Sequence, residues 1–242
     1  MQCLADMLAT PLPDESSAVQ RKAQVTYTLP CSLNEAIPSQ FILSESRALI
    51  SSSGTTGLRT WEGSLHLAHF LRTAVGRKLV EKKTVLELGA GTGLISLMCA
   101  KFLKAKRTMA TDGLGDVVQS MEENFVANGL NVPGDIECEV LKWGWMLKGS
   151  MFDEVDERNC VNTVLGGDIV RGESFRLRYL MAHRKLQTYD VSVIPSLVAT
   201  LRDLFDRYPS LRVLISATIR NQETFEVFLA ACGEALGPGQ ML

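Results

Sequence analysis

The residues that most clearly suggest chemistry are three alternate glycines after an apolar run at 84–88: Gly89, Gly91 and Gly93. The run predicts a buried strand, and the glycines predict a tight turn before a helix. Proteins with α/β folds bind nucleotide-like ligands at such turns. In a dinucleotide fingerprint the third glycine comes one residue later, where this chain has Leu94. The tighter spacing indicates a nucleotide-like ligand without a pyrophosphate.

Two acidic side chains accompany the glycines. Glu87 stands two residues before Gly89, and Asp112 ends a strand-like stretch nineteen residues after Gly93. One crossover helix and its turns fill that interval, so Asp112 should lie at the sheet edge that carries the glycines, where an acid can accept both ribose hydroxyls. As alternatives, Asp112 could be a turn or helix-cap residue and Glu87 could stabilise helix-start amides. We favour the ligand-binding interpretation for both.

Strand and helix patterns alternate along the rest of the chain. Strands are expected near 84–89, 107–112, 136–142, 162–168 and 212–219, and helices near 93–103, 115–128, 191–207 and 221–236. Such alternation predicts a doubly wound α/β fold, with a parallel sheet, helices on both of its faces, and the ligand at the carboxyl ends of the strands.

Further elements are expected before the glycines. A strand at 24–29 is predicted to pair with residues 48–51, and one amphipathic helix is predicted from Trp61 to Val75. The expected buried side of this helix consists of Leu65, Ala68, His69 and Leu71.

Length and composition describe an ordinary globular chain. Its 242 residues are 46% apolar and 21% charged, which suits one α/β domain, 54–242, after an N-terminal extension, 1–53. The net charge of -2 gives no general attraction to nucleic acid. Six cysteines without a C-x-x-C pair and three histidines without ligand spacing argue against a disulfide framework and a metal site. With no signal-peptide pattern and no apolar run of membrane-spanning length, we expect a cytoplasmic monomer that binds no metal, no membrane and no nucleic acid stably.

The acidic-x-Gly-x-Gly-x-Gly pattern that starts at Glu87 resembles motif I of the seven-β-strand methyltransferases, which use S-adenosyl-L-methionine. Thr56, Gly57 and Trp61 are similar to a T-G-x-x-x-W segment in the lysine methyltransferase branch of that class. Within this branch, the chain is most similar to the elongation factor 2 lysine methyltransferases of fungi. The similarity is carried by four segments: 56–65, 84–100, 110–130 and 193–231. The resemblance implies a Rossmann-like seven-strand sheet, which we expect to lack its C-terminal antiparallel strands here.

The resemblance also implies roles for individual residues. The expected cofactor-binding residues are Trp61, Glu87, Gly89, Ala90, Gly91, Gly93, Asp112, Trp143 and Gly167. Glu87 is expected near the methionine end of S-adenosyl-L-methionine and Trp143 against its adenine, whereas Trp145 is expected to pack in the hydrophobic core. The implied reaction moves a methyl group from this cofactor to a lysine of a cytoplasmic protein, elongation factor 2.

The expected acceptor site follows the fourth strand, where the branch carries D-x-x-Y. Here Asp168 and Ile169 are separated from Thr188 and Tyr189 by eighteen residues, 170–187, with a net charge of +4. Removing them restores D-x-x-Y, with Asp168 orienting the lysine amine and Tyr189 forming the channel wall. We interpret 170–187 as a translated intron that the working enzyme lacks. The alternative is a basic loop that recognises an acidic patch on the protein partner.

Other functions are compatible with the same cofactor loop. A methyltransferase for RNA or a small molecule could share the fold, although the residues that begin at Gly167 do not form the N-P-P-Y-like segment of adenine N6-enzymes. A non-catalytic paralogue, or a mis-spliced product, could keep the loop only to fold. An NAD-dependent oxidoreductase is disfavoured by the glycine spacing.

Overall fold

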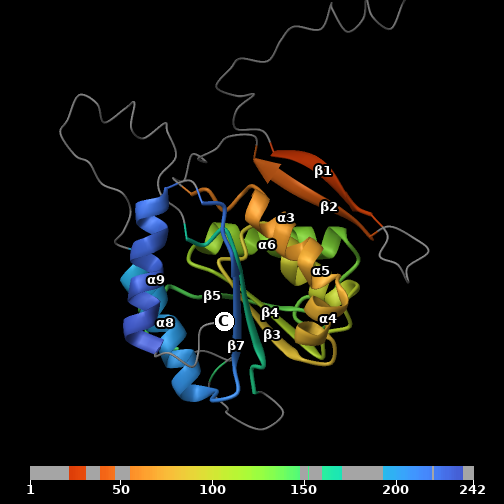
Figure 1. The fold of residues 1–242 in the computed structure, drawn as a ribbon. Helices are drawn as coiled ribbons and strands as arrows, with labels where there is room; N and C mark the ends of the chain where they lie inside the picture. The colour runs from red at the N-terminus through yellow and green to blue at the C-terminus, as the bar shows by residue number, and fades with distance from the viewer. Residues whose placement is uncertain are drawn as a thin grey trace, which may run out of the picture.

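The computed structural model describes residues 22–30, 39–46, 55–147, 152, 160–170, 193–219 and 221–236. At its centre is a five-stranded sheet with the order β5-β4-β3-β6-β7 (Figure 1). Each strand pairs in parallel with its neighbours; the strands are β3 (Thr84–Leu88), β4 (Arg107–Asp112), β5 (Glu137–Val140), β6 (Thr163–Gly167) and β7 (Arg212–Ser216). The predicted parallel α/β fold is therefore confirmed.

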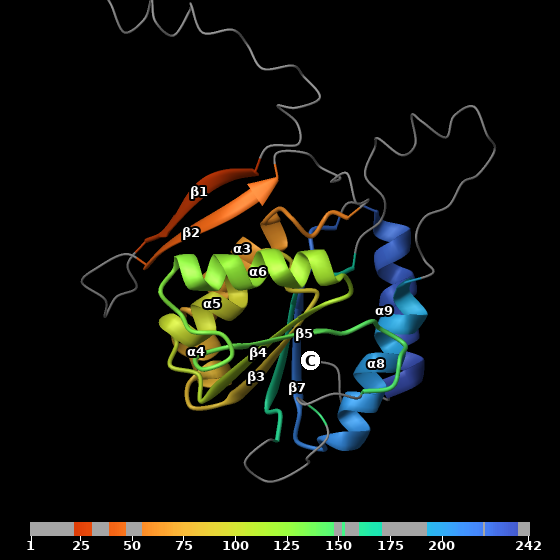
Figure 2. The ribbon, with the colours of Figure 1, turned by 180° about the vertical axis from the view of Figure 1, so that it is seen from behind.

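Helices cover both faces of this sheet (Figures 1 and 2). One face carries α3 (Glu62–Leu71), α4 (Ala74–Val80), α5 (Leu94–Lys101) and α6 (Gly115–Ala127), and the other carries α8 (Val193–Arg207) and α9 (Gln222–Leu236). Neighbouring strand residues alternate between the two cores, as Val85 and Leu86 do. Burial on both faces explains why β3 and β6 are largely apolar along their whole length. Within the described ranges, no helix combines the length and apolarity needed to cross a membrane.

The order of the strands places a crevice beside β3. From β3 the chain passes to β4 and β5 on one side and then returns to β6 and β7 on the other. Ligands of open parallel sheets bind where the strand order reverses in this way, outside the carboxyl ends of the strands. The loops after β3, β4 and β6 meet there, and they carry the residues from Gly89, Asp112 and Gly167 onward.

The first strand pairs with a segment that the sequence did not single out. β1 (Lys22–Leu29) pairs antiparallel with β2 (Ser39–Ser46), whereas residues 48–51 lie outside the described part of the chain. In β2 the buried Phe41 and Leu43 flank the more exposed Ile42, so one side of the strand joins the core on which α6 packs. The hairpin lies alongside α6 (Figure 2). The predicted domain boundary at residue 53 falls outside the described residues.

The prediction of a single helix from Trp61 to Val75 is wrong. It divides into α3 and α4, because Thr73 adopts an extended conformation and its side chain accepts a hydrogen bond from the Gly76 amide at 3.1 Å. Such a side chain caps the start of a new helix. His69, which we expected on the buried side, is exposed.

Candidate active site

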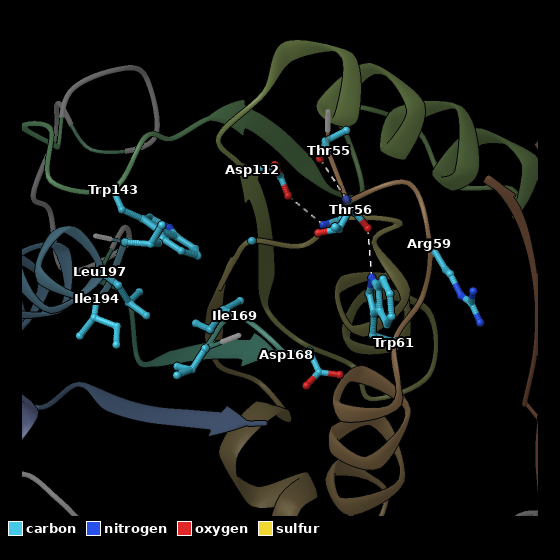
Figure 3. A pocket seen from close by; sticks show the side chains of 16 residues that line it. Thr55, Thr56, Arg59, Trp61, Asp112, Trp143, Asp168, Ile169, Ile194 and Leu197 are labelled. Carbon is cyan, nitrogen blue, oxygen red and sulfur yellow. Dashed lines mark hydrogen bonds between the residues drawn. The ribbon is translucent and has the colours of Figure 1, made fainter. Parts of the chain in front are cut away.

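A cleft of about 250 Å³ opens at the carboxyl ends of β3, β4 and β6 (Figure 3). The predicted site residues that line it are Trp61, Gly89, Gly91, Asp112, Trp143, Gly167 and Asp168. The other lining residues are Thr55, Thr56, Gly57, Arg59, Ile169, Val170, Val193, Ile194 and Leu197. The predicted residues Glu87, Ala90 and Gly93 are absent from the lining, and Tyr189 lies outside the described residues.

The floor of the cleft needs glycine for two reasons. Gly89 and Gly91 have φ angles of 61° and 56°, in the left-handed region that side chains disfavour. A Cβ atom on Gly91 would also lie 2.9 Å from the Gly57 carbonyl oxygen, and one on Gly89 would lie 3.1 Å from the Trp143 ring. The glycines therefore let the segment 55–61 and Trp143 close tightly over the loop.

Asp112 faces the cleft from the end of β4. One carboxylate oxygen accepts a hydrogen bond from the Gly91 amide at 3.1 Å, which joins the acid to the glycine loop. Burial raises the pKa of Asp112, and hydrogen bonds from the amides of Gly91, Gly113 and Leu114 oppose that rise. A carboxylate has about four acceptor positions, so one remains for a hydroxyl group of a ligand.

Glu87 is 1% exposed and lies behind the loop. Its Oε2 accepts hydrogen bonds from the Ser96 amide, at 2.7 Å, and from the Ser96 hydroxyl, in the first turn of α5. Burial raises the pKa of Glu87 to about 8, although the bonds from Ser96 lower it. This contact with a helix start is the alternative role left open by the sequence, and a contact between Glu87 and a cofactor stays a prediction.

One wall of the cleft is formed by the segment 55–61. The Trp61 indole donates a hydrogen bond to the Thr56 carbonyl oxygen at 3.0 Å, and the Arg59 guanidinium lies 5.2 Å from the centre of the Trp61 ring. These contacts hold an aromatic side chain and a cation on the same side of the cleft (Figure 3). Of the T-G-x-x-x-W motif, only Trp61 was expected to bind the cofactor, although Thr56 and Arg59 of the same motif also line the cleft.

The opposite wall is apolar. Trp143, Ile194 and Leu197 lie together on the side away from Trp61 (Figure 3). Sequence reasoning missed Ile194 and Leu197, because they come from α8, far along the chain, and their helix pattern indicates only burial. The predicted packing of Trp145 is wrong: it is 69% exposed, and the Lys142 ammonium lies 5.6 Å from the centre of its ring.

Asp168 joins three parts of the chain at the edge of the cleft. Its Oδ2 accepts from the Gly63 amide at 2.7 Å, near the start of α3, and its Oδ1 accepts from the Thr218 amide at 2.7 Å. The Thr218 hydroxyl also donates to Oδ2, at 3.3 Å. Asp168 has a φ of 55°, which Asp tolerates better than most residues. Three of about four acceptor positions are occupied, so Oδ1 keeps one for another donor.

The end of β4 and the apolar wall of the cleft match the chemistry of a nucleoside. A carboxylate at the end of β4 suits ribose hydroxyls, and the aromatic and aliphatic wall around Trp143 suits a purine face. Among the residues that the structure describes, no cluster of His, Cys, Asp and Glu could hold a metal ion.

The fold and the cleft define an α/β protein whose site suits a nucleoside, and the sequence comparisons narrow this class. The sequence profile of a lysine methyltransferase family matches residues 47–182, which are 136 of the 242 residues. The chain therefore belongs to the lysine methyltransferase family.

Named relatives agree with this family. The chain is 43% identical to protein-lysine N-methyltransferase EFM3 of Chaetomium thermophilum over 96% of its own length and 63% of the relative's. It is 30% identical to EFM3 of Saccharomyces cerevisiae, with coverages of 79% and 53%, and 31% identical to protein-lysine N-methyltransferase EEF2KMT of Homo sapiens, with coverages of 80% and 54%. The chain thus spans between about half and two thirds of the length of these relatives.

Proposed function

We propose that this chain transfers a methyl group from S-adenosyl-L-methionine to a lysine side chain of a protein, and that elongation factor 2 in the cytoplasm is the substrate. The observation that carries the proposal is the cleft, in which Gly91 and Asp112 are hydrogen-bonded at the strand edge of a lysine methyltransferase family member. The choice of elongation factor 2 rests on the likeness to the relatives named EFM3 and EEF2KMT.

The described residues fit this cofactor. Asp112 would hold the ribose hydroxyls, Trp143 and Leu197 would contact the adenine, and the loop that begins at Gly89 would hold the methionine end. When bound, the cofactor supplies a reactive methyl group on a sulfonium, so the protein has to bind, orient and exclude water.

The acceptor amine has to lose its proton before it can attack. A lysine in water has a pKa of about 10.4, and removing it from water lowers that pKa. An apolar surface near the acceptor edge, which includes Ile169, would provide this desolvation. Asp168 would then orient the amine through the unused acceptor position of Oδ1. Tyr189, for which we propose a place in the channel wall, lies outside the described residues.

Methyl transfer tests the proposal directly. Purified elongation factor 2 is incubated with the chain and methyl-labelled cofactor, and lysines are analysed by mass spectrometry after proteolysis. We expect label on a lysine of elongation factor 2, and an Asp112→Ala variant serves as the control that should give none. Label that enters RNA or a small molecule when a cell lysate replaces the purified protein would contradict the substrate class. Cofactor binding without any transfer would favour the non-catalytic alternative.

A further inference from the structure

A buried polar chain connects the N-terminal hairpin to both loops of the cleft. Glu45, on β2, is 5% exposed, and its Oε1 accepts a hydrogen bond from the Thr60 hydroxyl at 2.5 Å. The Thr60 and Thr92 hydroxyls lie 2.6 Å apart. Because the only hydroxyl proton of Thr60 goes to Glu45, the Thr92 hydroxyl has to donate to Thr60. Glu45 therefore holds the segment 55–61 against the glycine loop.

A second connection reaches the same loop from α6. The side-chain amide of Asn124 accepts a hydrogen bond from the Ser44 amide at 2.8 Å and donates one to the Thr92 carbonyl oxygen at 3.1 Å. Asn128, one turn later, accepts from the Ile42 amide and donates to the Ile42 carbonyl oxygen, at 3.0 and 2.7 Å. The side chains of Asn124 and Asn128 thus hydrogen-bond the backbone of β2 and hold this strand along α6. Thr92 is held through both its hydroxyl and its carbonyl group.

The end of β2 also contacts the cleft wall through its backbone. The Ser46 amide donates to the Leu58 carbonyl oxygen at 2.7 Å. Leu58 lies between Gly57, whose carbonyl oxygen crosses over Gly91, and Arg59, which lines the cleft. Two adjacent residues of the hairpin, at positions 45 and 46, therefore contact the wall segment.

We propose that the β1–β2 hairpin is a positioning element of the cofactor cleft and that it acts through Glu45. This inference rests on the proposed function, because the ligand of the cleft is taken to be S-adenosyl-L-methionine. Glu45 does not line the cleft, so it is a positioning residue: it joins Thr60 to Thr92 and so fixes the wall that carries Trp61 over the glycine floor. Satisfied buried networks of this kind favour one arrangement of the loops that they join.

The hydroxyl of Thr60 offers a matched test. Thr60→Val keeps the shape of the side chain but removes both hydrogen bonds, Thr60→Ser keeps them, and Thr28→Val makes the same change at an exposed hairpin residue. We expect Thr60→Val to weaken binding of S-adenosyl-L-methionine about tenfold, because a bond to a charged group is lost. Thr60→Ser should bind within about twofold of the unmodified chain and Thr28→Val should bind equally well.

The kinetic readout separates positioning from general damage. Thr60→Val should raise the KM for the cofactor about tenfold and leave the KM for the protein substrate unchanged. Circular dichroism checks the fold of each variant, and Thr92→Val, which breaks the Thr60–Thr92 bond from the other side, replaces Thr60→Val should that protein not fold. A folded variant with normal cofactor affinity, or with both KM values raised equally, overturns the inference. If the unmodified chain itself binds no cofactor, the proposed function fails instead.

Discussion

The two sides of the cleft are built in different ways. The cofactor side is built around one stretch of sequence, from Gly89 to Asp112. Hydrogen bonds from the Gly91 amide to Asp112 and from the Ala90 amide to the Thr111 carbonyl oxygen join the two ends of this stretch. The acceptor side depends on Asp168, which connects Gly63 and Thr218, residues that lie 105 and 50 positions away. A site of the first kind can be recognised from local spacing, whereas a site of the second kind exists only once the sheet has formed.

The largest expected effect separates the two sides. Asp112→Ala should reduce the affinity for S-adenosyl-L-methionine at least about 100-fold, because the charge-assisted hydrogen bond to the ribose and the acceptor of the Gly91 amide are both lost. Calorimetric titration measures the affinity, and thermal unfolding shows whether the fold is intact. Asp112→Glu keeps the negative charge but moves the carboxylate, so this control separates the loss of charge from the loss of hydrogen-bond geometry. Undiminished affinity in folded Asp112→Ala would remove the ribose role.

Asp168→Ala should act on the acceptor side alone. We expect turnover on elongation factor 2 to fall about 100-fold, since the amine is no longer oriented, while cofactor affinity changes less than about threefold. The protein should also lose about 2 kcal/mol of stability, because the amides of Gly63 and Thr218 lose their acceptor. Steady-state kinetics and urea unfolding measure the two effects. Normal turnover would contradict the orienting role and leave Asp168 as a structural cap.

Deletion of residues 170–187 sharpens the acceptor side. The deletion brings Thr188 and Tyr189 next to Ile169 and restores D-x-x-Y, so turnover should rise about tenfold as the acceptor geometry is recovered. In the full chain, an Arg176→Ala, Arg178→Ala double variant tests the rival interpretation as a docking loop. A higher KM for elongation factor 2 in that variant, or mature transcripts that retain these codons in active protein, would contradict the intron interpretation.

The last effect concerns stability rather than turnover. Burial raises the pKa of Glu87 to about 8 from an ordinary value of 4.5. Between these two pH values the folded protein keeps a proton that the unfolded chain has lost, so the contribution of Glu87 to stability falls as pH rises through this window. Glu87→Gln keeps an acceptor for Ser96 without titrating, and it should be on the order of 2 kcal/mol more stable than the unmodified chain at pH 8.

Urea unfolding at several pH values checks this prediction. The two proteins should differ least near pH 4, where Glu87 is protonated in both the folded and the unfolded state. Parallel pH profiles for the two proteins would show that the carboxyl of Glu87 does not titrate as the burial implies.

Local patterns predicted the elements around the cofactor. The central residues of β3, β4 and β6 are buried, and the positions of these strands followed from the patterns near 84–89, 107–112 and 162–168. Gly91 and Asp112 both line the cleft. The sequence predicted this, because one crossover helix fits between the glycine turn and the acid. In each case a short stretch of chain contains the whole cause.

Other features depend on tertiary contacts that spacing does not reveal. The partner of β1 is 39–46 because Phe41 and Leu43 reach the core on which α6 packs. Trp145 is an aromatic residue, a type that is often buried, but the tertiary fold leaves its side chain exposed. The buried hydrogen bond between Glu45 and Thr60 joins two segments, and no pattern in either segment predicts this contact.

Direct titration of the unmodified chain with S-adenosyl-L-methionine tests the central claim most directly. We predict one saturable site per chain, competition by the demethylated product S-adenosyl-L-homocysteine, and no binding of NAD. The absence of saturable binding, or a preference for NAD, would contradict the account of the cleft.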